Sequence, residues 1–212
     1  MAGPSTPRQA RSKLTLERIV GTARELWTER GNDGFTLDEV SERSGVSIGS
    51  IYNRFAGKQD LVEHLHEQGV EAMVDDVRAR MTAPGIAHDL PGRVDWLVRV
   101  VGSLLSDHAA VLRPSMVAAL RNERIAAMGK RGHAVMVEHW AERLREVGDE
   151  IAAPDVEEAI SWSFTVAYSV LARYLGLGSS AESAYEGDWD ASLRQLTLTV
   201  VGYLSYQREE SS

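Results

Sequence analysis

Helical periodicity is the feature that most constrains how this chain can fold. From Thr15 onward, apolar residues such as Leu16, Ile19 and Ala23 recur three or four positions apart, which places them along one face of an α-helix. The same spacing returns after each interruption by Gly or Pro, and no alternating strand pattern of useful length is present. We therefore predict an all-α protein built from nine or ten helices.

The absence of cysteine narrows the chemistry that the chain can perform. None of the 212 residues is a cysteine, so thiol nucleophiles, cysteine-bound zinc and disulfides are excluded. A chain of this length buries enough surface to fold without such links. No apolar run approaches the roughly 18 residues of a membrane span, and the N-terminus lacks the apolar core of a signal peptide. We expect a soluble, cytoplasmic protein that does not insert into a membrane.

The net charge of −8 is unevenly distributed along the chain. Residues 1–58 carry nine Lys and Arg against seven Asp and Glu, whereas the remaining residues carry 14 against 24. The field of a protein depends on where its charges lie as well as on their sum. Only the first part of the chain is therefore suited to contact phosphates.

Residues 1–13 are rich in Pro, Ser, Gly and Arg and lack helical periodicity, which predicts a mobile arm. Its cations Arg8, Arg11 and Lys13 can add contacts to DNA phosphates or to the minor groove, and a tail that only aids solubility is the alternative. The first helix follows and ends at Gly31, a residue suited to the left-handed conformation after a helix end.

Two short helices are expected after the first one. Thr36 and Glu39 have the spacing of a capping box, which predicts a helix that begins there and stops at Gly45. Ser47 can cap the next helix, which carries Ile51 on its inner side. Two short helices joined by a tight turn and packed against a longer one form a helix-turn-helix, whose second helix enters the major groove of DNA.

The stretch FTLDEVSERSGVSIGSIYNRFAGKQDL resembles the DNA-binding signature of TetR-family (tetracycline-repressor-like) transcriptional regulators. The positions that carry this resemblance are Gly31, Phe35, Thr36, Gly45, Val46, Ser47, Gly49, Ile51, Tyr52, Phe55, Lys58 and Leu61. Two positions depart from the family pattern. Arg54 stands where many members have His or Tyr, and Gly57 stands where Ser or Asn commonly caps the following helix.

The resemblance and the expected geometry divide the candidate DNA contacts into two groups. Phosphate contacts are expected from Thr36, Tyr52, Arg54 and Lys58. Base contacts are expected from Leu37, Ser47, Ile48, Ser50 and Asn53, with Gly49 leaving room for DNA to approach. A packing role for Tyr52 and a solvated surface role for Lys58 are the alternatives.

The rest of the chain continues as helices. A long fourth helix is expected from Gly57 to the helix breaker Pro84, and an amphipathic stripe follows over residues 90–105. Pro114 is expected to separate this stripe from the next helix, because proline removes a backbone donor and strains the preceding turn.

The last two helices, over residues 155–177 and from Asp188 onward, are the expected interface of a homodimer. Asp155 can cap the first of them, which is apolar almost all round from Trp162 onward. A helix without a polar face is buried on several sides, and a second copy of the chain is a natural cover. A central core helix of a monomer is the alternative.

By resemblance, residues 14–60 form the helix-turn-helix DNA-binding domain, and residues 61–212 form a helical bundle that binds a small-molecule effector and dimerises. The candidates for its pocket are the long apolar and aromatic side chains Trp96, Met116, Met136, Trp140, Trp162 and Tyr168. Each of them can instead be an ordinary core residue. Since no charge is concentrated on the apolar faces, a largely apolar or aromatic ligand is favoured.

Catalytic and metal-binding interpretations find little support. His64 and His66 are two positions apart and His133 and His139 are six apart, so neither pair has the i, i+4 spacing of a helical zinc site. No cofactor, metal or enzyme activity is therefore expected. The leading hypothesis is a dimeric, ligand-responsive repressor on partly palindromic double-stranded operator DNA. The alternative is a helical ligand-binding or catalytic domain whose N-terminal motif no longer reads DNA.

Overall fold

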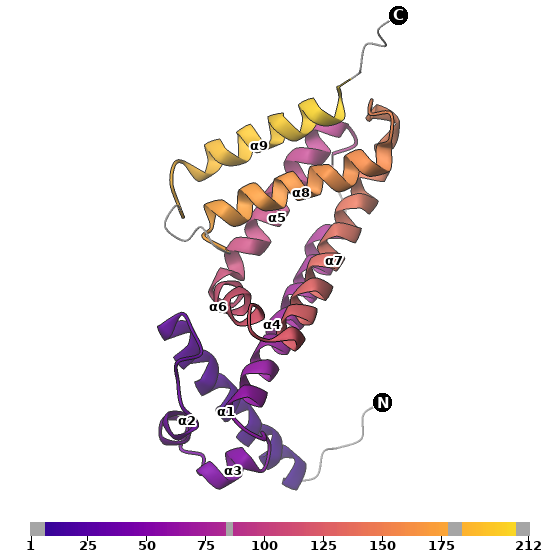
Figure 1. Ribbon diagram of the computed structural model, residues 1–212. Coiled ribbons are helices and arrows are strands. Elements are labelled where there is room, and N and C mark those ends of the chain that lie inside the picture. The colour runs from indigo at the N-terminus through magenta and orange to yellow at the C-terminus, as the bar shows by residue number, and fades with distance from the viewer. Residues whose placement is uncertain (1–6, 84–86, 178–183, 207–212) are drawn as a thin grey trace, which may run out of the picture.

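The computed structural model describes residues 7–83, 87–177 and 184–206 (Figure 1). Within these ranges the chain forms nine α-helices, one short 3-10 turn and no strand, so the predicted all-α fold is confirmed. The elements in chain order are α1 (Pro7–Arg30), α2 (Leu37–Ser44), α3 (Ile48–Tyr52), α4 (Lys58–Met81), α5 (Leu90–Asp107), α6 (Ala109–Ala119), α7 (Glu123–Arg145), η1 (Gly148–Glu150), α8 (Val156–Tyr174) and α9 (Trp189–Leu204).

Two apolar cores lie one above the other along the molecule (Figure 1). The lower core joins α1, α2 and α3 to the start of α4, which contributes Leu61 and Leu65. The upper core joins α5, α7, α8 and α9 to the later part of α4, which contributes Met73 and Val77. Helix α4 therefore takes part in both cores, the lower one up to Leu65 and the upper one from Met73 onward.

Helix α1 begins earlier than expected. Residues 7–13, predicted to belong to a mobile arm, are helical from Pro7 onward, and residues 1–6 of that arm lie outside the described ranges. Proline is favourable at the first position of a helix, because the N–H that it lacks has no partner within the helix. Lys13 and Glu17 then form an ion pair one turn apart, at 3.8 Å.

Pro114 lies inside α6 and does not separate two helices, so that expectation is corrected. Helix α5 instead ends at its C-cap His108, and α6 follows directly. Helix α7 begins after Asn122, whose side chain accepts hydrogen bonds from the first turn of that helix. The proline is buried. Its packing offsets the single backbone hydrogen bond that a proline removes from a helix interior.

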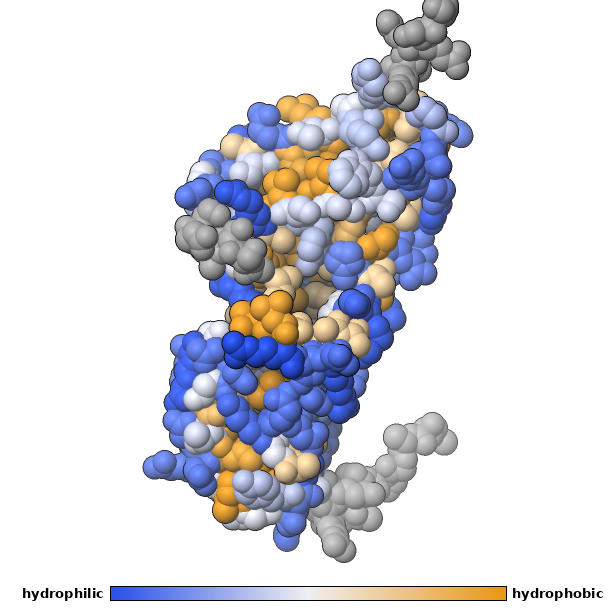
Figure 2. Space-filling view, in the orientation of Figure 1, coloured by the Kyte–Doolittle hydropathy of each residue, from blue (hydrophilic) through white to orange (hydrophobic). Residues whose placement is uncertain are grey.

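Helix α8 begins as predicted after Asp155, whose side chain accepts a hydrogen bond from the Glu158 backbone N–H at 2.9 Å. One side of α8 belongs to the upper core, but this chain leaves the other side open: Trp162 and Val170 are 54% and 42% exposed. Leu198 on the adjacent α9 is also exposed. Figure 2 shows apolar atoms gathered over these two helices.

Candidate DNA-binding site and ligand cavity

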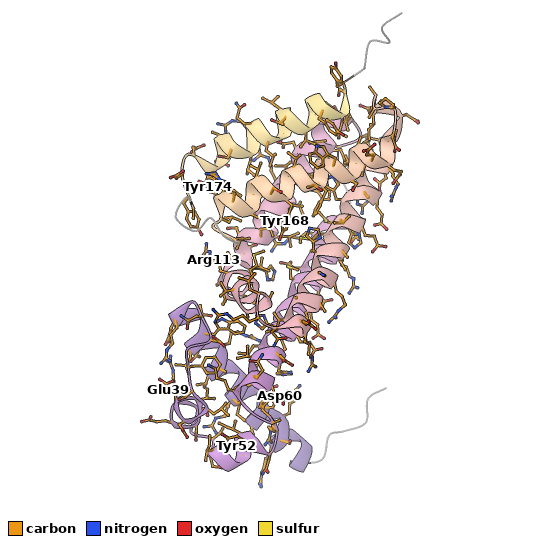
Figure 3. The ribbon with its side chains drawn as sticks, viewed as in Figure 1. Glu39, Tyr52, Asp60, Arg113, Tyr168 and Tyr174 are labelled. Atoms are coloured by element: carbon orange, nitrogen blue, oxygen red, sulfur yellow. The ribbon has the colours of Figure 1, made fainter. Side chains whose placement is uncertain are left out.

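The N-terminus of α2 is fixed by the predicted capping box. The Glu39 backbone N–H donates to Thr36 Oγ1 at 3.2 Å, and the Thr36 backbone N–H donates to Glu39 Oε2 at 2.7 Å. Arg30 at the end of α1 adds an ion pair with Glu39 Oε1 at 2.6 Å. The hydrogen bonds from Arg30 and from the Thr36 backbone lower the pKa of Glu39 to about 2. Glu39 therefore remains ionised and links α1 to the start of α2 (Figure 3).

The turn between α2 and α3 has the conformation that its sequence predicts. Gly45 adopts a φ of +66°, which L-residues with a side chain rarely adopt. Arg18 of α1 donates a hydrogen bond to the Ser44 carbonyl beside it, and Ser41 Oγ donates to the Val46 carbonyl at 2.7 Å. A Cβ placed on Gly45 would lie 2.9 Å from Arg18 Nη2. The turn is thus held from α1 as well as from its own ends.

Helix α3 presents an open surface at its first turn. Ser47 caps the helix by accepting a hydrogen bond from the Ser50 backbone N–H at 3.3 Å, and the two hydroxyl oxygens lie 2.9 Å apart. A Cβ placed on Gly49 would meet no atom within 4 Å. Nothing in the described ranges therefore requires glycine there, which agrees with a position kept clear for an external partner.

The residues expected to contact bases differ in how exposed they are. Asn53 is exposed beyond the end of α3, and Ile48 and Ser50 are half-buried at its edge. Leu37, however, is only 8% exposed and belongs to the lower core, so little of its side chain is available for the expected base contact. As the first residue after the capping Thr36, it points inward beneath α1 rather than outward.

The four expected phosphate contacts differ in how they are held. Tyr52 is 57% exposed (Figure 3), which argues against a packing role. Lys58 lies 3.9 Å from Asp33 Oδ2, with its Nζ 5.4 Å from the centre of the Phe35 ring. The alternative of an unconstrained surface lysine is thereby weakened, since both contacts hold its ammonium near the N-terminus of α4.

Arg54 and the start of α4 show how the two departures from the family pattern are accommodated. Arg54 Nη2 donates to the Ser12 carbonyl at 3.3 Å, and Nη1 donates to the Ser50 carbonyl at 3.2 Å, so this side chain braces α3 against α1. Gly57 provides no side-chain cap for α4. Asp60 compensates for the missing side-chain cap, because its carboxylate accepts a hydrogen bond from the Ala56 backbone N–H at 3.0 Å (Figure 3).

A cavity of about 310 Å³ lies where α4, α5, α6, α7 and α8 meet. Its wall is mainly apolar and includes Val70, Met73, Leu105, Leu112, Met116, Met128 and Met136. His66, which is 1% exposed, marks its inner end. The exposed side chains of Lys130 and His133 on α7 mark its mouth. Figure 2 shows that the surface is hollowed between α8 and the apolar patch over α6.

Three of the six predicted pocket residues line this cavity, namely Met116, Met136 and Tyr168. The other three do not, and these predictions are corrected. Trp140 is fully buried in the upper core and donates from Nε1 to Ser163 Oγ at 3.0 Å. Trp96 packs at the edge of that core, and Trp162 lies on the open side of α8. Helical spacing identifies the apolar face of a helix, but it does not show whether a residue on that face packs in the core or lines a cavity.

Sequence reasoning missed the histidines of the cavity, His66, His108 and His133. His108 Nε2 lies 3.1 Å from Asp76 Oδ2, while burial lowers the pKa of His66 to about 4 and also lowers that of His133. The available signal was a histidine set within an apolar stripe, next to Leu65. In the described part of the chain, no group of three His, Asp or Glu side chains could hold a metal ion.

Comparisons with known proteins agree with this geometry. Residues 19–65 match the family described as "Bacterial regulatory proteins, tetR family". The HTH-type transcriptional regulator UidR of Escherichia coli is 27% identical over 157 residues, which cover 72% of this chain and 76% of UidR. A structure of a regulator assigned to the TetR family from Mesorhizobium loti has a TM-score of 0.67 at 16% identity, covering 92% of this chain and 97% of that one. GusR of Salmonella enterica has a TM-score of 0.63 at 23% identity, covering 91% and 96%.

A helix-turn-helix with an open recognition helix, carried by a larger helical body, defines a DNA-binding transcriptional regulator rather than an enzyme. By the family match, residues 19–65 are a DNA-binding domain of the tetR family of bacterial regulatory proteins, and the whole chain shares the fold of the M. loti structure. Over the ranges that the structure covers, no helix has both the length and the apolar character needed to cross a membrane.

Proposed function

We propose that this protein is a dimeric repressor that binds a partly palindromic operator and releases it when a small apolar or aromatic ligand fills the cavity. The observation that carries the proposal is the course of α4. This helix begins beside the recognition helix with Lys58 and lines the cavity with Val70 and Met73. A ligand in the cavity therefore contacts the same helix that contributes a phosphate contact.

On DNA, α3 would lie in the major groove. The exposed Tyr52 hydroxyl, the Lys58 ammonium and the N-terminal end of α2 at Thr36 contact phosphates and set the position of the helix. Asn53 is suited to pair with an adenine, and Ile48 to meet a thymine methyl group. Ser47 and Ser50 offer hydroxyls, and Gly49 keeps the backbone close to the base edges.

The proposed dimer is formed by α8 and α9. Trp162 and Val170 are exposed along one side of α8, and Leu198 is 65% exposed on α9. A shallow groove between the two helices is lined by Val166 and Val170 on one side and by Gln195 and Thr199 on the other. The same face of a second chain, related by a two-fold axis, can cover these apolar groups and place two recognition helices on one operator.

Release follows from differential affinity. A ligand shifts the protein between two conformations only by as much as it binds one of them more tightly. The cavity contacts α4, α6 and α7 at the level where the two cores meet. Occupation of the cavity would favour an arrangement of these helices in which the two recognition helices no longer match successive major grooves.

The DNA arm of this proposal is tested with the full chain and a fluorescent duplex from the region upstream of its own gene. We expect binding at low salt with a log–log salt slope of about −0.9 for each phosphate contact. Apolar and aromatic compounds are then screened for release of that duplex. Binding of equal strength to the upstream duplex and to random DNA would contradict operator recognition.

The dimer arm is tested by sedimentation of single-site variants. Val170→Glu and Leu198→Glu should each convert the dimer to a monomer, because each places a charge in an apolar interface. Leu120→Glu is the matched control, since Leu120 is 84% exposed and caps the end of α6, outside α8 and α9. A wild-type chain that sediments as a monomer at micromolar concentration would overturn this arm.

A further inference from the structure

His66 is an unusual side chain for the inner end of an apolar cavity. It is 1% exposed, it lines the cavity, and among the described residues neither of its ring nitrogens has a hydrogen-bond partner. Its ring meets that of Trp27 edge-on, with centroids 4.4 Å apart. Buried polar groups without a partner are rare in folded proteins, and each requires an explanation.

The protonation state of His66 defines what kind of group can pair with it. Burial lowers the pKa of His66 to about 4, so the imidazole is neutral near neutral pH. A neutral imidazole has one donor N–H and one acceptor nitrogen. A hydroxyl, which both donates and accepts, can therefore satisfy either tautomer.

Other polar groups of the cavity are placed differently. His108 Nε2 is paired with Asp76, and Ser115 Oγ donates to the Val111 carbonyl at 2.7 Å. Lys130 lies at the exposed mouth. A charged ligand group can remain hydrated at that mouth, whereas the inner end is walled by buried side chains that cannot compensate a charge.

We propose that the ligand of this cavity is an apolar molecule with one uncharged hydroxyl, and that this hydroxyl pairs with His66. The inference rests on the proposed function, since it assigns a ligand class to the same cavity. The volume of about 310 Å³ is roughly twice that of a cavity known to hold benzene. The expected ligand is therefore about the size of two fused aromatic rings, and phenol-like compounds of this size are its class.

Pairing at His66 also brings the ligand to the junction of the two cores. His66 belongs to α4, and its ring contacts Trp27 of α1. A hydroxyl that reorients the imidazole therefore changes a contact between the regulatory body and the DNA-binding part.

The experiment measures the affinity of the full chain for 2-naphthol and for naphthalene by titration calorimetry. We expect 2-naphthol to bind the wild-type protein about tenfold more tightly than naphthalene, because only 2-naphthol supplies the missing partner of His66. In His66→Leu this preference should vanish while naphthalene still binds. Met128→Leu is the control: it changes the apolar wall with little change in volume, so it should keep the tenfold preference.

Each outcome bears on a different statement. Equal affinities of the wild-type protein for the two probes, or a preference that survives in His66→Leu, would overturn the pairing at His66 and leave the cavity as a ligand site. Binding of neither probe would overturn both the pairing and the cavity's assignment as a ligand site. The comparison of the two probes on the wild-type chain holds even if His66→Leu fails to fold.

Discussion

The part of the molecule that meets DNA and the part that holds the cavity treat their polar groups in opposite ways. Around α2 and α3, Glu39 binds both Thr36 and Arg30, and Arg18 and Ser41 fix the turn. In the body, a cavity remains open and His66 has no partner within the described structure. The first arrangement specifies one shape before DNA is met. The second leaves one buried polar side chain of the cavity, His66, without a hydrogen-bond partner among the described residues.

The largest expected effect comes from truncating a buried side chain of the lower core. Ile51 is fully buried there, so Ile51→Ala should lower the free energy of unfolding by about 2–5 kcal/mol, as other large-to-small core substitutions do. We expect DNA binding to be lost while 2-naphthol still binds. Urea unfolding followed by circular dichroism, together with calorimetry, measures the two effects. Ile48→Ala, at a half-buried position of the same helix, should have the smaller effect on stability. Loss of both activities together would show that the two parts unfold as one unit.

The next prediction concerns the contacts with DNA. Asn53→Ala should weaken binding by about 1–3 kcal/mol and relax the preference at one base pair. Tyr52→Phe removes only a phosphate contact and should weaken binding to specific and random sequences alike. Fluorescence anisotropy on a set of single-base operator variants separates the two patterns. An Asn53→Ala protein that loses equal affinity for specific and random DNA would refute its role in base readout.

Glycines of the helix-turn-helix offer a sharper contrast between stability and DNA binding. Gly45→Ala forces a side chain into the left-handed region and should destabilise the protein by about 1–2 kcal/mol. In Gly49→Ala the new Cβ meets no atom of the described residues within 4 Å, and alanine favours the helix, so the melting temperature of this variant should be equal to that of the wild type or higher. We nevertheless expect Gly49→Ala to bind DNA more weakly. Wild-type affinity in Gly49→Ala would show that the open position is not used for DNA approach.

The smallest expected effect is a dependence of stability on pH through Glu39. Its pKa is about 2 in the folded protein, against an ordinary value of 4.5. The stabilisation from ionised Glu39 is therefore complete above pH 4.5 and is lost as the pH falls toward 2. The stability difference between the wild type and Glu39→Gln should narrow over this range. Glu42→Gln, which removes one exposed charge from the same helix, is the control. A difference that stays constant from pH 5 to pH 2.5 would contradict the ion-pair explanation.

Local signals predicted the DNA-binding part well because its shape depends on local chemistry. The Thr36–Glu39 box, the left-handed Gly45 and the Ser47 cap each act within a few residues of themselves. The exception is Leu37, a predicted base contact whose side chain packs in the lower core. From sequence alone, capping residues therefore predict where these helices begin more reliably than helical spacing predicts which side chains are exposed.

The cavity was less predictable because it arises where five helices fail to fill the space between them. Trp140 and Met136 have similar apolar settings in sequence and both belong to the upper core, yet only Met136 also lines the cavity, whereas Trp140 pairs with Ser163. Pro114 stands within α6 because its ring is buried by packing that sequence alone does not reveal. Such outcomes depend on distances between helices, and periodicity contains no information about those distances.

In the proposed mechanism, the length of α4 would enlarge at the DNA-binding end any movement that begins at the cavity. Its 24 residues make a rod of about 36 Å, at 1.5 Å for each residue. A tilt of about 5° would carry one end of such a rod roughly 3 Å past the other. In the proposed dimer, a small tilt of each α4 at its cavity would change the distance between the two recognition helices. A displacement comparable to the rise of one base pair is therefore within reach of a ligand that moves its neighbours by much less.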